Sequence, residues 1–206
     1  MLGMFPMSDS RTNKNFFFVD PKFRAVIPIL NFHISKSLLR FVKKKPFKIS
    51  INKAFPDVIK SCATINRTET WINKEIETLF ISLHKMNYAH SIECWQNNTM
   101  VGGIYGLAIG GVFFAESMFS LIPNGSKVAL LNLVAILWKT GFKVLDVQFL
   151  NKHLLQFGAY EISKKEFQTQ LQKAIQLDVD ILSFGKTDND FSDCLSTFLQ
   201  ARIEMS

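Results

Sequence analysis

The apolar residues recur every three or four positions in several parts of the chain, which is the spacing of an amphipathic helix. Thr70 and Ser126 are suitable N-caps for the two longest of these stretches, and Gly141 is a suitable C-cap for the second. Gly158 follows the shortest one. The spacing predicts helices over residues 35–45, 54–63, 71–87, 127–140 and 151–157.

In other stretches the apolar period changes to two, which is typical of strands. The dipeptides Asn97-Asn98 and Gly110-Gly111 separate three of these stretches, and both favour tight hairpin turns because they tolerate a positive φ. These three stretches are therefore expected to form an antiparallel meander. The predicted strands cover residues 47–51, 90–95, 100–109, 112–117 and 143–149.

The predicted order is a pair of helices, an antiparallel meander, a helix and a further strand. This order is typical of an α/β (α+β) acyltransferase fold of the GNAT type, in which helices flank the meander. The acetyl-CoA version of that fold holds pyrophosphate with a Gly-rich loop at the start of the helix after the meander. Here the corresponding residues 120–127 read SLIPNGSK and contain one glycine. The acetyl-CoA site is therefore predicted to be absent.

The pattern divides the chain into three regions. Residues 1–22 are expected to be a short irregular N-terminal segment, because turn-forming residues interrupt them. Residues 23–170 contain the predicted elements and are expected to form a single GNAT-like domain. Residues 171–206 carry six acidic and three basic residues without a clear apolar period, and are expected to form an acidic C-terminal tail.

Composition excludes several protein classes. The 206 residues are 48% hydrophobic and 20% charged, which is near the globular average and argues against disorder. No apolar run approaches the ~20 residues of a membrane-spanning helix, and no signal peptide is visible. Cys62, Cys94 and Cys194 include no C-x-x-C pair, which argues against a disulfide framework and a Cys-rich metal site. The simplest interpretation is a cytoplasmic protein with no membrane partner.

The net charge of +7 is concentrated in one part of the chain. Between Asp20 and Asp57 there are nine basic residues and no acidic ones, whereas the rest holds 15 basic and 17 acidic residues. In the helix predicted at residues 35–45, four of the nine form one stripe at positions i, i+4, i+7 and i+8. The stripe consists of Lys36, Arg40, Lys43 and Lys44.

A charged stripe is usually only a solvated helix face. Like charges one turn apart repel each other, however, and a polyanion would offset that repulsion. Nucleic acid is the first candidate for such a partner, and an anionic membrane surface is the second.

Three polar residues interrupt apolar strands. Asp146 and Gln148 are two positions apart on the predicted strand 143–149, so they point to the same face and could position a nucleophile and accept its proton. An ordinary edge strand with a polar outer face is the alternative. Glu116 follows an apolar run in the strand 112–117, and it is either a pocket for a cation or a buried group with a local partner.

Several segments resemble one known family, in unbroken order over residues 3–170. The most specific are ESMFS (116–120) and the D-x-Q…HL…GA pattern of DVQFLNKHLLQFGAYEI (146–162). The others are GMFPM (3–7), VDPKFRAVIP (19–28), FHISKSL (32–38), AFPDVIKSCA (54–63), TWIN (70–73), AHSIECW (89–95), VGGIYGLAIGGVFFAESMFS (101–120) and NGSKVAL (124–130). The chain resembles the leucyl/phenylalanyl-tRNA–protein transferase family, whose members move an amino acid from tRNA to the N-terminus of a protein.

The resemblance assigns roles to residues. It implies that Asp146 and Gln148 are the catalytic pair and that Glu116 faces the basic side chain of the acceptor. It implies that Trp71 stacks on the terminal adenosine of the tRNA, with Met7 on the other side where many members have Trp. It matches the basic stripe to the family's tRNA-binding residues. It also implies a pocket for the transferred side chain, lined by Ile104, Phe113, Met118, Leu130, Leu137 and Leu145.

The implied activity is transfer of Leu or Phe, with Met as a further candidate, from aminoacyl-tRNA to proteins that begin with Arg or Lys. Such a transfer marks the acceptor for degradation in the N-degron pathway. The resemblance implies no cofactor and no metal, a truncated form of the family's N-terminal region in residues 1–22, and a chain that acts as a monomer. Two rivals remain: an acyl-CoA N-acetyltransferase of the same fold, and a non-catalytic tRNA-binding module.

Overall fold

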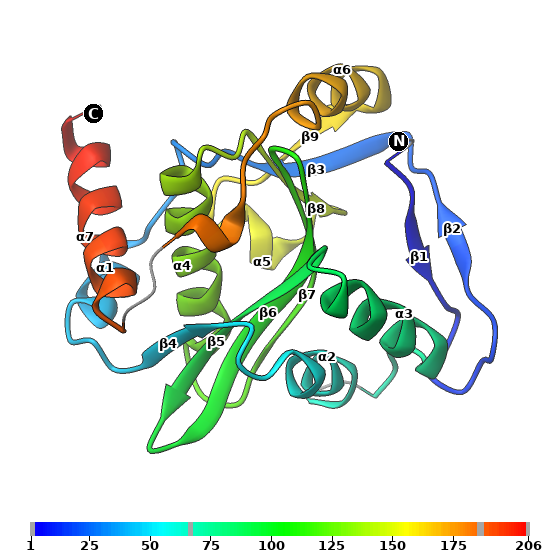
Figure 1. The fold of residues 1–206 in the computed structure, drawn as a ribbon, viewed down its shortest axis with the longest axis horizontal. Coiled ribbons are helices and arrows are strands. Elements are labelled where there is room, and N and C mark those ends of the chain that lie inside the picture. Colours follow the sequence, from blue (N-terminus) through cyan, green and yellow to red (C-terminus); the bar gives the residue numbers. More distant parts are fainter. Residues whose placement is uncertain (1–2, 66–67, 185–187, 205–206) are drawn as a thin grey trace.

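A seven-stranded sheet forms the centre of the molecule (Figure 1). The structure is a computed structural model that describes residues 3–65, 68–184 and 188–204. The strand order is β4-β5-β6-β7-β8-β3-β9, and every neighbouring pair is antiparallel except β7 and β8, which are parallel. The strands are β3 (Phe23–Ile27), β4 (Lys48–Ile51), β5 (Ala89–Gln96), β6 (Thr99–Ile109), β7 (Val112–Ser120), β8 (Val144–Gln148) and β9 (Tyr160–Ser163).

The predicted meander is confirmed as β5, β6 and β7. Asn97 and Asn98 have φ of 49° and 63° in the first hairpin turn, and Gly110 has φ of 52° in the second. Tight hairpin turns require this left-handed backbone, which asparagine and glycine adopt at low cost. The predicted order of a helix pair, a meander, a helix and a further strand is likewise observed, so the α/β acyltransferase-type fold expected from the sequence is confirmed.

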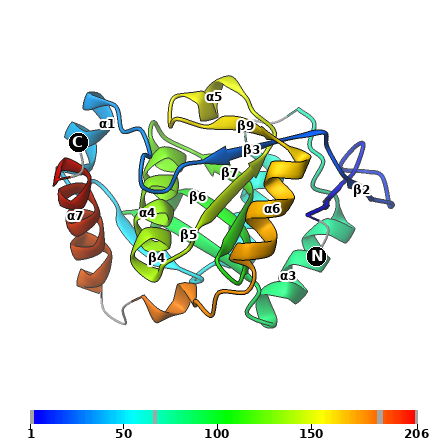
Figure 2. The ribbon, with the colours of Figure 1, turned by 90° about the horizontal axis from the view of Figure 1, so that it is seen from above.

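Helices cover both faces of the sheet (Figure 2). One face packs against α4 (Gly125–Thr140), with α1 (Lys36–Val42) and α7 (Asp188–Glu204) beside it. The other face packs against α2 (Phe55–Thr64) and α3 (Lys74–Lys85) at one end and α6 (Lys164–Ala174) at the other. Two short helices complete the set, α5 (Lys152–Leu155) and the 3-10 helix η1 (Ile181–Ser183). No described helix combines the length and the apolar character that crossing a membrane requires.

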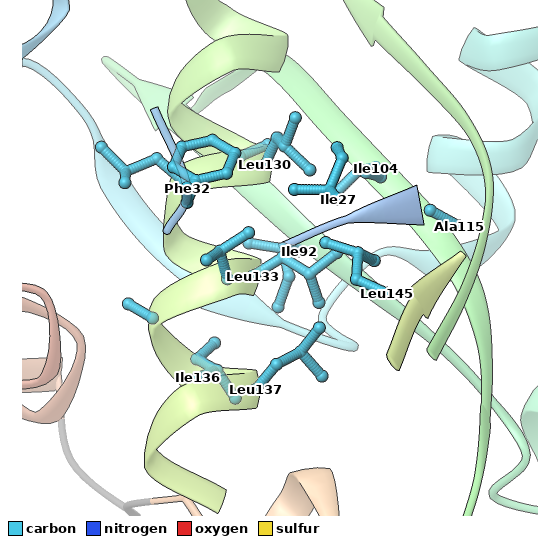
Figure 3. Close-up of a cluster of buried hydrophobic side chains, with 14 of the residues drawn as sticks. Ile27, Phe32, Ile92, Ile104, Ala115, Leu130, Leu133, Ile136, Leu137 and Leu145 are labelled. Atoms are coloured by element: carbon cyan, nitrogen blue, oxygen red, sulfur yellow. The ribbon is translucent and has the colours of Figure 1, made fainter. Parts of the chain in front are cut away.

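Helix α4 supplies the largest part of the core (Figure 3). Its residues from Val128 to Leu137 are all buried, including Leu130, Leu133 and Leu137, which are 0% exposed. They pack against Ile92 and Ile104 from the meander strands. A helix that is apolar on nearly all sides must be covered on all sides. The sheet covers one side of α4, and α7 contacts it from another.

Two predicted helix caps are wrong. Asn73, not Thr70, caps α3, because its side-chain oxygen accepts a hydrogen bond from the Ile76 N–H at 2.9 Å. Helix α4 starts at Gly125, and Ser126 lies in its first turn instead of capping it. The Ser126 N–H instead donates to the Ser120 hydroxyl at 3.0 Å, so the end of strand β7 satisfies this group.

The N-terminal segment is more regular than predicted. Strands β1 (Phe5–Met7) and β2 (Phe17–Val19) form a separate two-stranded antiparallel sheet. Strands β3 and β9 were also not predicted. The region after residue 170 contains the end of α6, η1 and α7, and α7 packs on α4. The division at residues 22 and 170 stays a prediction.

Candidate active site

A pocket opens where strands β7 and β8 part. The two strands pair from Val112 and Val144 as far as Phe114 and Asp146, and the pairing ends there. The following residues of both strands line one pocket of about 230 Å³. Its lining includes Ala115, Glu116, Ser117 and Met118 from β7, and Val147, Gln148 and Phe149 from the end of β8 and the residue after it. Because the backbone groups between the parted strands are not joined, a ligand can enter the sheet at this point.

Glu116 lies in this pocket at an irregularity of strand β7. Tyr105 pairs with Ser117 and Gly106 pairs with Ala115, so Glu116 has no partner of its own on β6. Such a bulge redirects a side chain. Glu116 is 8% exposed, and this burial raises its pKa to about 8. The negative charge of Asp146 adds to the rise, whereas a hydrogen bond from Gln148 and the charge of Arg24 oppose it.

Gln148 connects the two strands across the pocket. Its side-chain Nε2 donates to Oε2 of Glu116 at 2.6 Å. It is the last residue of β8 and has φ of 64°, a left-handed conformation that is unfavourable for a residue with a Cβ. Non-glycine residues in this conformation concentrate at functional sites. The backbone N–H of Gln148 donates to Oδ1 of Asp146 at 2.9 Å, which helps to hold this turn.

Asp146 does not line the pocket. Its side chain is 0% exposed and forms a two-pronged ion pair with Arg24, in which Nε donates to Oδ1 at 2.9 Å and Nη2 donates to Oδ2 at 2.5 Å. Burial raises the pKa of Asp146, and the Arg24 guanidinium opposes that rise. Asp146 is therefore connected to the pocket by its hydrogen bond from the Gln148 backbone, and its own side chain does not line the pocket.

Arg24 was not singled out in the sequence. A signal for it existed, because it is the one charged residue in the strand FRAVI, where its neighbours Ala25, Val26 and Ile27 are all buried. A charge in such a strand needs a partner of opposite sign. Asp146, 122 positions further along the chain, supplies it.

Three of the six residues predicted to line the pocket for the transferred side chain do line the cavity. Ile104, Met118 and Leu130 line the cavity. Phe113, Leu137 and Leu145 are at most 1% exposed and belong to the hydrophobic core instead of the lining. The cavity wall also includes residues that were not predicted, namely Ala115, Ser117, Val147, Phe149, Asn151 and Leu154.

Trp71 and Met7 differ in their relation to the cavity. Trp71 lines the cavity, whereas Met7, the last residue of β1, does not. The next residue, Ser8, donates its N–H to the Trp71 carbonyl at 3.3 Å, so the N-terminal strand runs beside Trp71.

The basic stripe is exposed along its whole length. Lys36 and Arg40 lie on α1, Lys43 is its C-cap, and Lys44 follows. Ser35 caps this helix, because its side-chain oxygen accepts a hydrogen bond from the Leu38 N–H at 3.2 Å. None of the four basic residues forms an ion pair with a carboxylate whose side chain the structure describes. Their charge therefore faces solvent.

The described residues contain no group of three His, Cys, Asp or Glu side chains placed to hold a metal ion. Burial raises the pKa of the Cys94 thiol, so this cysteine is held in its neutral form.

Comparison with known proteins identifies the family. The model of the leucyl/phenylalanyl-tRNA protein transferase family matches residues 26–172, a range that contains Glu116, Asp146 and Gln148. The chain belongs to this family. The range also includes the basic stripe, whereas Arg24 and strand β1 lie before it.

Curated relatives agree with this assignment. A leucyl/phenylalanyl-tRNA–protein transferase of Phenylobacterium zucineum is 48% identical over 185 residues, which cover 89% of this chain and 84% of the relative. One of Caulobacter vibrioides is 43% identical over 203 residues, covering 97% and 92% of the two chains. Among solved structures, the L-PGS of Bacillus licheniformis is similar with a TM-score of 0.40 and 12% identity, over 74% of this chain and 51% of that one.

Proposed function

We propose that this protein transfers Leu or Phe, with Met as a further candidate donor residue, from aminoacyl-tRNA to the α-amino group of proteins that begin with Arg or Lys. The observation that carries the proposal is the pocket between the parted strands β7 and β8, closed by the Glu116–Gln148 hydrogen bond, in a chain of this family. The transfer would mark its acceptors for degradation as an N-degron step, in the cytoplasm, with the enzyme acting as a monomer and without a cofactor.

The reaction needs positioning more than activation. The acceptor nitrogen attacks the ester carbonyl, an amide bond forms, the ester bond to the ribose oxygen breaks, and the proton lost by nitrogen is balanced by the proton that the ribose oxygen takes up. A free α-amine has a pKa of about 7.7–8.0 and is partly neutral at cellular pH. Alignment of amine and ester can contribute several of the ~7–11 kcal/mol available from ideal orientation.

Gln148 and Glu116 are the groups placed to touch the acceptor. Both line the cavity, and the Gln148 side-chain carbonyl is free to accept a hydrogen bond from the attacking nitrogen because its Nε2 is the atom bound to Glu116. Glu116 would bind the cationic side chain of the first acceptor residue. Asp146, which is enclosed by Arg24, would position Gln148 through the backbone hydrogen bond.

Ile104, Met118 and Leu130 are proposed to recognise the transferred side chain, because they form the apolar part of the cavity. Trp71 is proposed to hold the terminal adenosine, with Met7 nearby. The other three predicted lining residues, Phe113, Leu137 and Leu145, would act by supporting this wall from the core.

Shortening Met118 should change the choice between Leu and Phe. Met118→Ala enlarges the cavity next to the substrate side chain, so Leu should lose more contact than the larger Phe. We expect the ratio of kcat/KM for Leu to kcat/KM for Phe to fall by about 10- to 200-fold. This corresponds to about 1–3 kcal/mol, the range for a methylene in an apolar pocket. Competition between leucyl- and phenylalanyl-tRNA measures this ratio. An unchanged ratio in a folded variant would remove Met118 from the pocket.

The basic stripe is proposed to bind the tRNA. Reversing Lys36, Arg40, Lys43 and Lys44 to Glu should raise KM for aminoacyl-tRNA and flatten its salt dependence, since fewer counterions are released on binding. Transfer from aminoacyl-adenosine, which lacks the tRNA body, should change little. If transfer from this small donor falls to the same extent, the stripe supports the fold and does not bind tRNA.

The two rival functions are separable by the choice of donor. An acyl-CoA N-acetyltransferase should bind CoA and transfer from acetyl-CoA, although residues 120–127 lack the Gly-rich loop for it. A non-catalytic tRNA-binding module should bind tRNA and tolerate loss of Glu116 and Gln148. The proposed function predicts transfer from leucyl-tRNA and from leucyl-adenosine, no transfer from acetyl-CoA, and loss of transfer in Gln148→Ala.

A further inference from the structure

We propose that Arg24 is a positioning residue that fastens the N-terminal strand to the active site, so that residues 3–8 hold two walls of the pocket in place. The inference deepens the proposed function and rests on it for the identity of the substrates. It concerns a residue and a segment that lie outside the family match, which begins at residue 26.

Arg24 is held on every side. Its side chain is 3% exposed, and two of its nitrogens are bound to the carboxylate of Asp146. The third, Nη1, donates to the Gly3 carbonyl at 2.6 Å. The guanidinium lies between two aromatic rings, 4.6 Å from the centre of the Phe5 ring and 4.8 Å from that of Phe167. The guanidinium is planar and permanently charged, so it can stack on rings and form several hydrogen bonds at the same time. A lysine ammonium cannot do both.

The N-terminal segment that Arg24 binds also contacts two walls of the pocket. The Phe5 ring meets the Phe149 ring edge-on, at 5.4 Å between centres and an angle of 82°. Three residues later, Ser8 donates its N–H to the Trp71 carbonyl. Phe149 and Trp71 both line the pocket. One buried cation therefore joins Asp146, which positions Gln148, to a strand that contacts two walls of the same pocket.

Gly3, whose carbonyl binds Arg24, leaves no room for a side chain. It has φ of +73°, and a Cβ at this position would lie 2.8 Å from Cε1 of Phe167 and 3.3 Å from Cδ2 of Leu171. A side chain here would be strained in its backbone and would collide with the ring that stacks on Arg24. Gly3→Ala is thus a way to release the strand without changing the Arg24–Asp146 ion pair. Met4, the next residue, is 40% exposed and offers a matched control.

The first test measures the anchor without activity. Backbone hydrogen exchange is compared in wild type, Arg24→Lys, Gly3→Ala and Met4→Ala. We expect exchange in peptides covering residues 3–8 to become at least about tenfold faster in Arg24→Lys and Gly3→Ala and to stay unchanged in Met4→Ala. Unchanged exchange in the first two variants would overturn the proposal, whatever their activity.

The second test connects the anchor to the site. In Gly3→Ala, KM for leucyl-adenosine should rise about five- to tenfold with a smaller change in kcat, because the walls are loosened while the ion pair remains. In Arg24→Lys, kcat should fall as well, since Asp146 and Gln148 lose their support. Faster exchange with kinetics identical to wild type in both variants would show that the strand is attached but plays no part in the site. If wild type itself transfers nothing, the proposed function fails, and the exchange result alone then decides whether Arg24 anchors the strand.

Discussion

Replacing Glu116 by glutamine is expected to raise KM for Arg-initiated peptides by about one to two orders of magnitude, which corresponds to roughly 1.5–3 kcal/mol for a charge-assisted hydrogen bond. The variant keeps the shape of the side chain and its contact with Gln148 but removes the charge. Affinity for aminoacyl-tRNA should not change, and discrimination against peptides with a neutral first residue should shrink. A loss of tRNA affinity equal to the loss for peptide would contradict an acceptor role.

The pKa of Glu116 gives this prediction a pH dependence. Because burial raises that pKa to about 8, the carboxyl group of the empty pocket is mostly protonated at neutral pH. A cationic side chain binds the carboxylate, so its binding releases a proton. KM for Arg-initiated peptides should therefore fall as pH rises between about 6 and 8. Glu116→Gln keeps the titration of the peptide amine but loses that of residue 116, so the difference between the two pH profiles isolates Glu116.

The same pKa predicts that Glu116→Gln is the more stable protein. An acid whose pKa is raised from 4.5 to about 8 on folding binds its proton more tightly in the folded state. The free energy of unfolding of wild type therefore falls as pH rises across this range, and the glutamine variant avoids that loss. Its Tm should exceed that of wild type by a few degrees above about pH 8, since 1 kcal/mol shifts Tm by about 2–4 °C in a domain of this size. A lower Tm at every pH would mean that Glu116 braces the sheet.

Replacing Asp146 by asparagine is expected to reduce both transfer and stability. The substitution leaves Arg24 buried without its counter-charge, which costs about 3–5 kcal/mol in comparable ion pairs. The backbone N–H of Gln148 is left with a neutral amide oxygen in place of a carboxylate fixed by Arg24, so Gln148 should shift and kcat should fall by about two orders of magnitude, as for misplaced groups at a reacting centre.

A double variant separates the two effects of Asp146. Arg24→Met together with Asp146→Leu removes both charges, and replacing a buried pair by apolar residues is often neutral for stability. We expect the free energy of unfolding, measured in urea, to return towards the wild-type value in this variant. Transfer should stay low, because the support of Gln148 and of the N-terminal strand is still missing. Recovery of transfer along with stability would show that the ion pair serves the fold alone.

Local patterns allowed the main elements of the fold to be predicted from the sequence. The Asn97-Asn98 and Gly110-Gly111 turns fixed the meander, because their chemistry is specific to tight hairpins. The apolar face of α4 and its Gly141 cap, which has φ of 87°, were equally clear. Strands β3 and β9 were missed because their pairing with β8 and with each other joins residues far apart in the chain.

The site shows the same division between local and distant information. Glu116 and Gln148 stood out because polar side chains interrupted apolar strands, but their contact across 32 positions could not be read from spacing. The role of Asp146 depends on Arg24, a partner from a distant strand. Likewise, Phe113, Leu137 and Leu145 carry the same apolar signal as the residues that line the cavity, and spacing along the chain does not show which of them reach it.

The most direct test of the proposed function is the mass of the acceptor. The protein is incubated with leucyl-tRNA and a peptide that begins with Arg, and the peptide is then analysed by mass spectrometry with fragmentation. A matched peptide that begins with Ala, and the protein variant Gln148→Ala, serve as controls. We expect one leucyl residue to be added at the α-amino group of the Arg peptide only, and only by the wild-type protein. A peptide that stays unmodified in the presence of intact leucyl-tRNA and folded protein would contradict it.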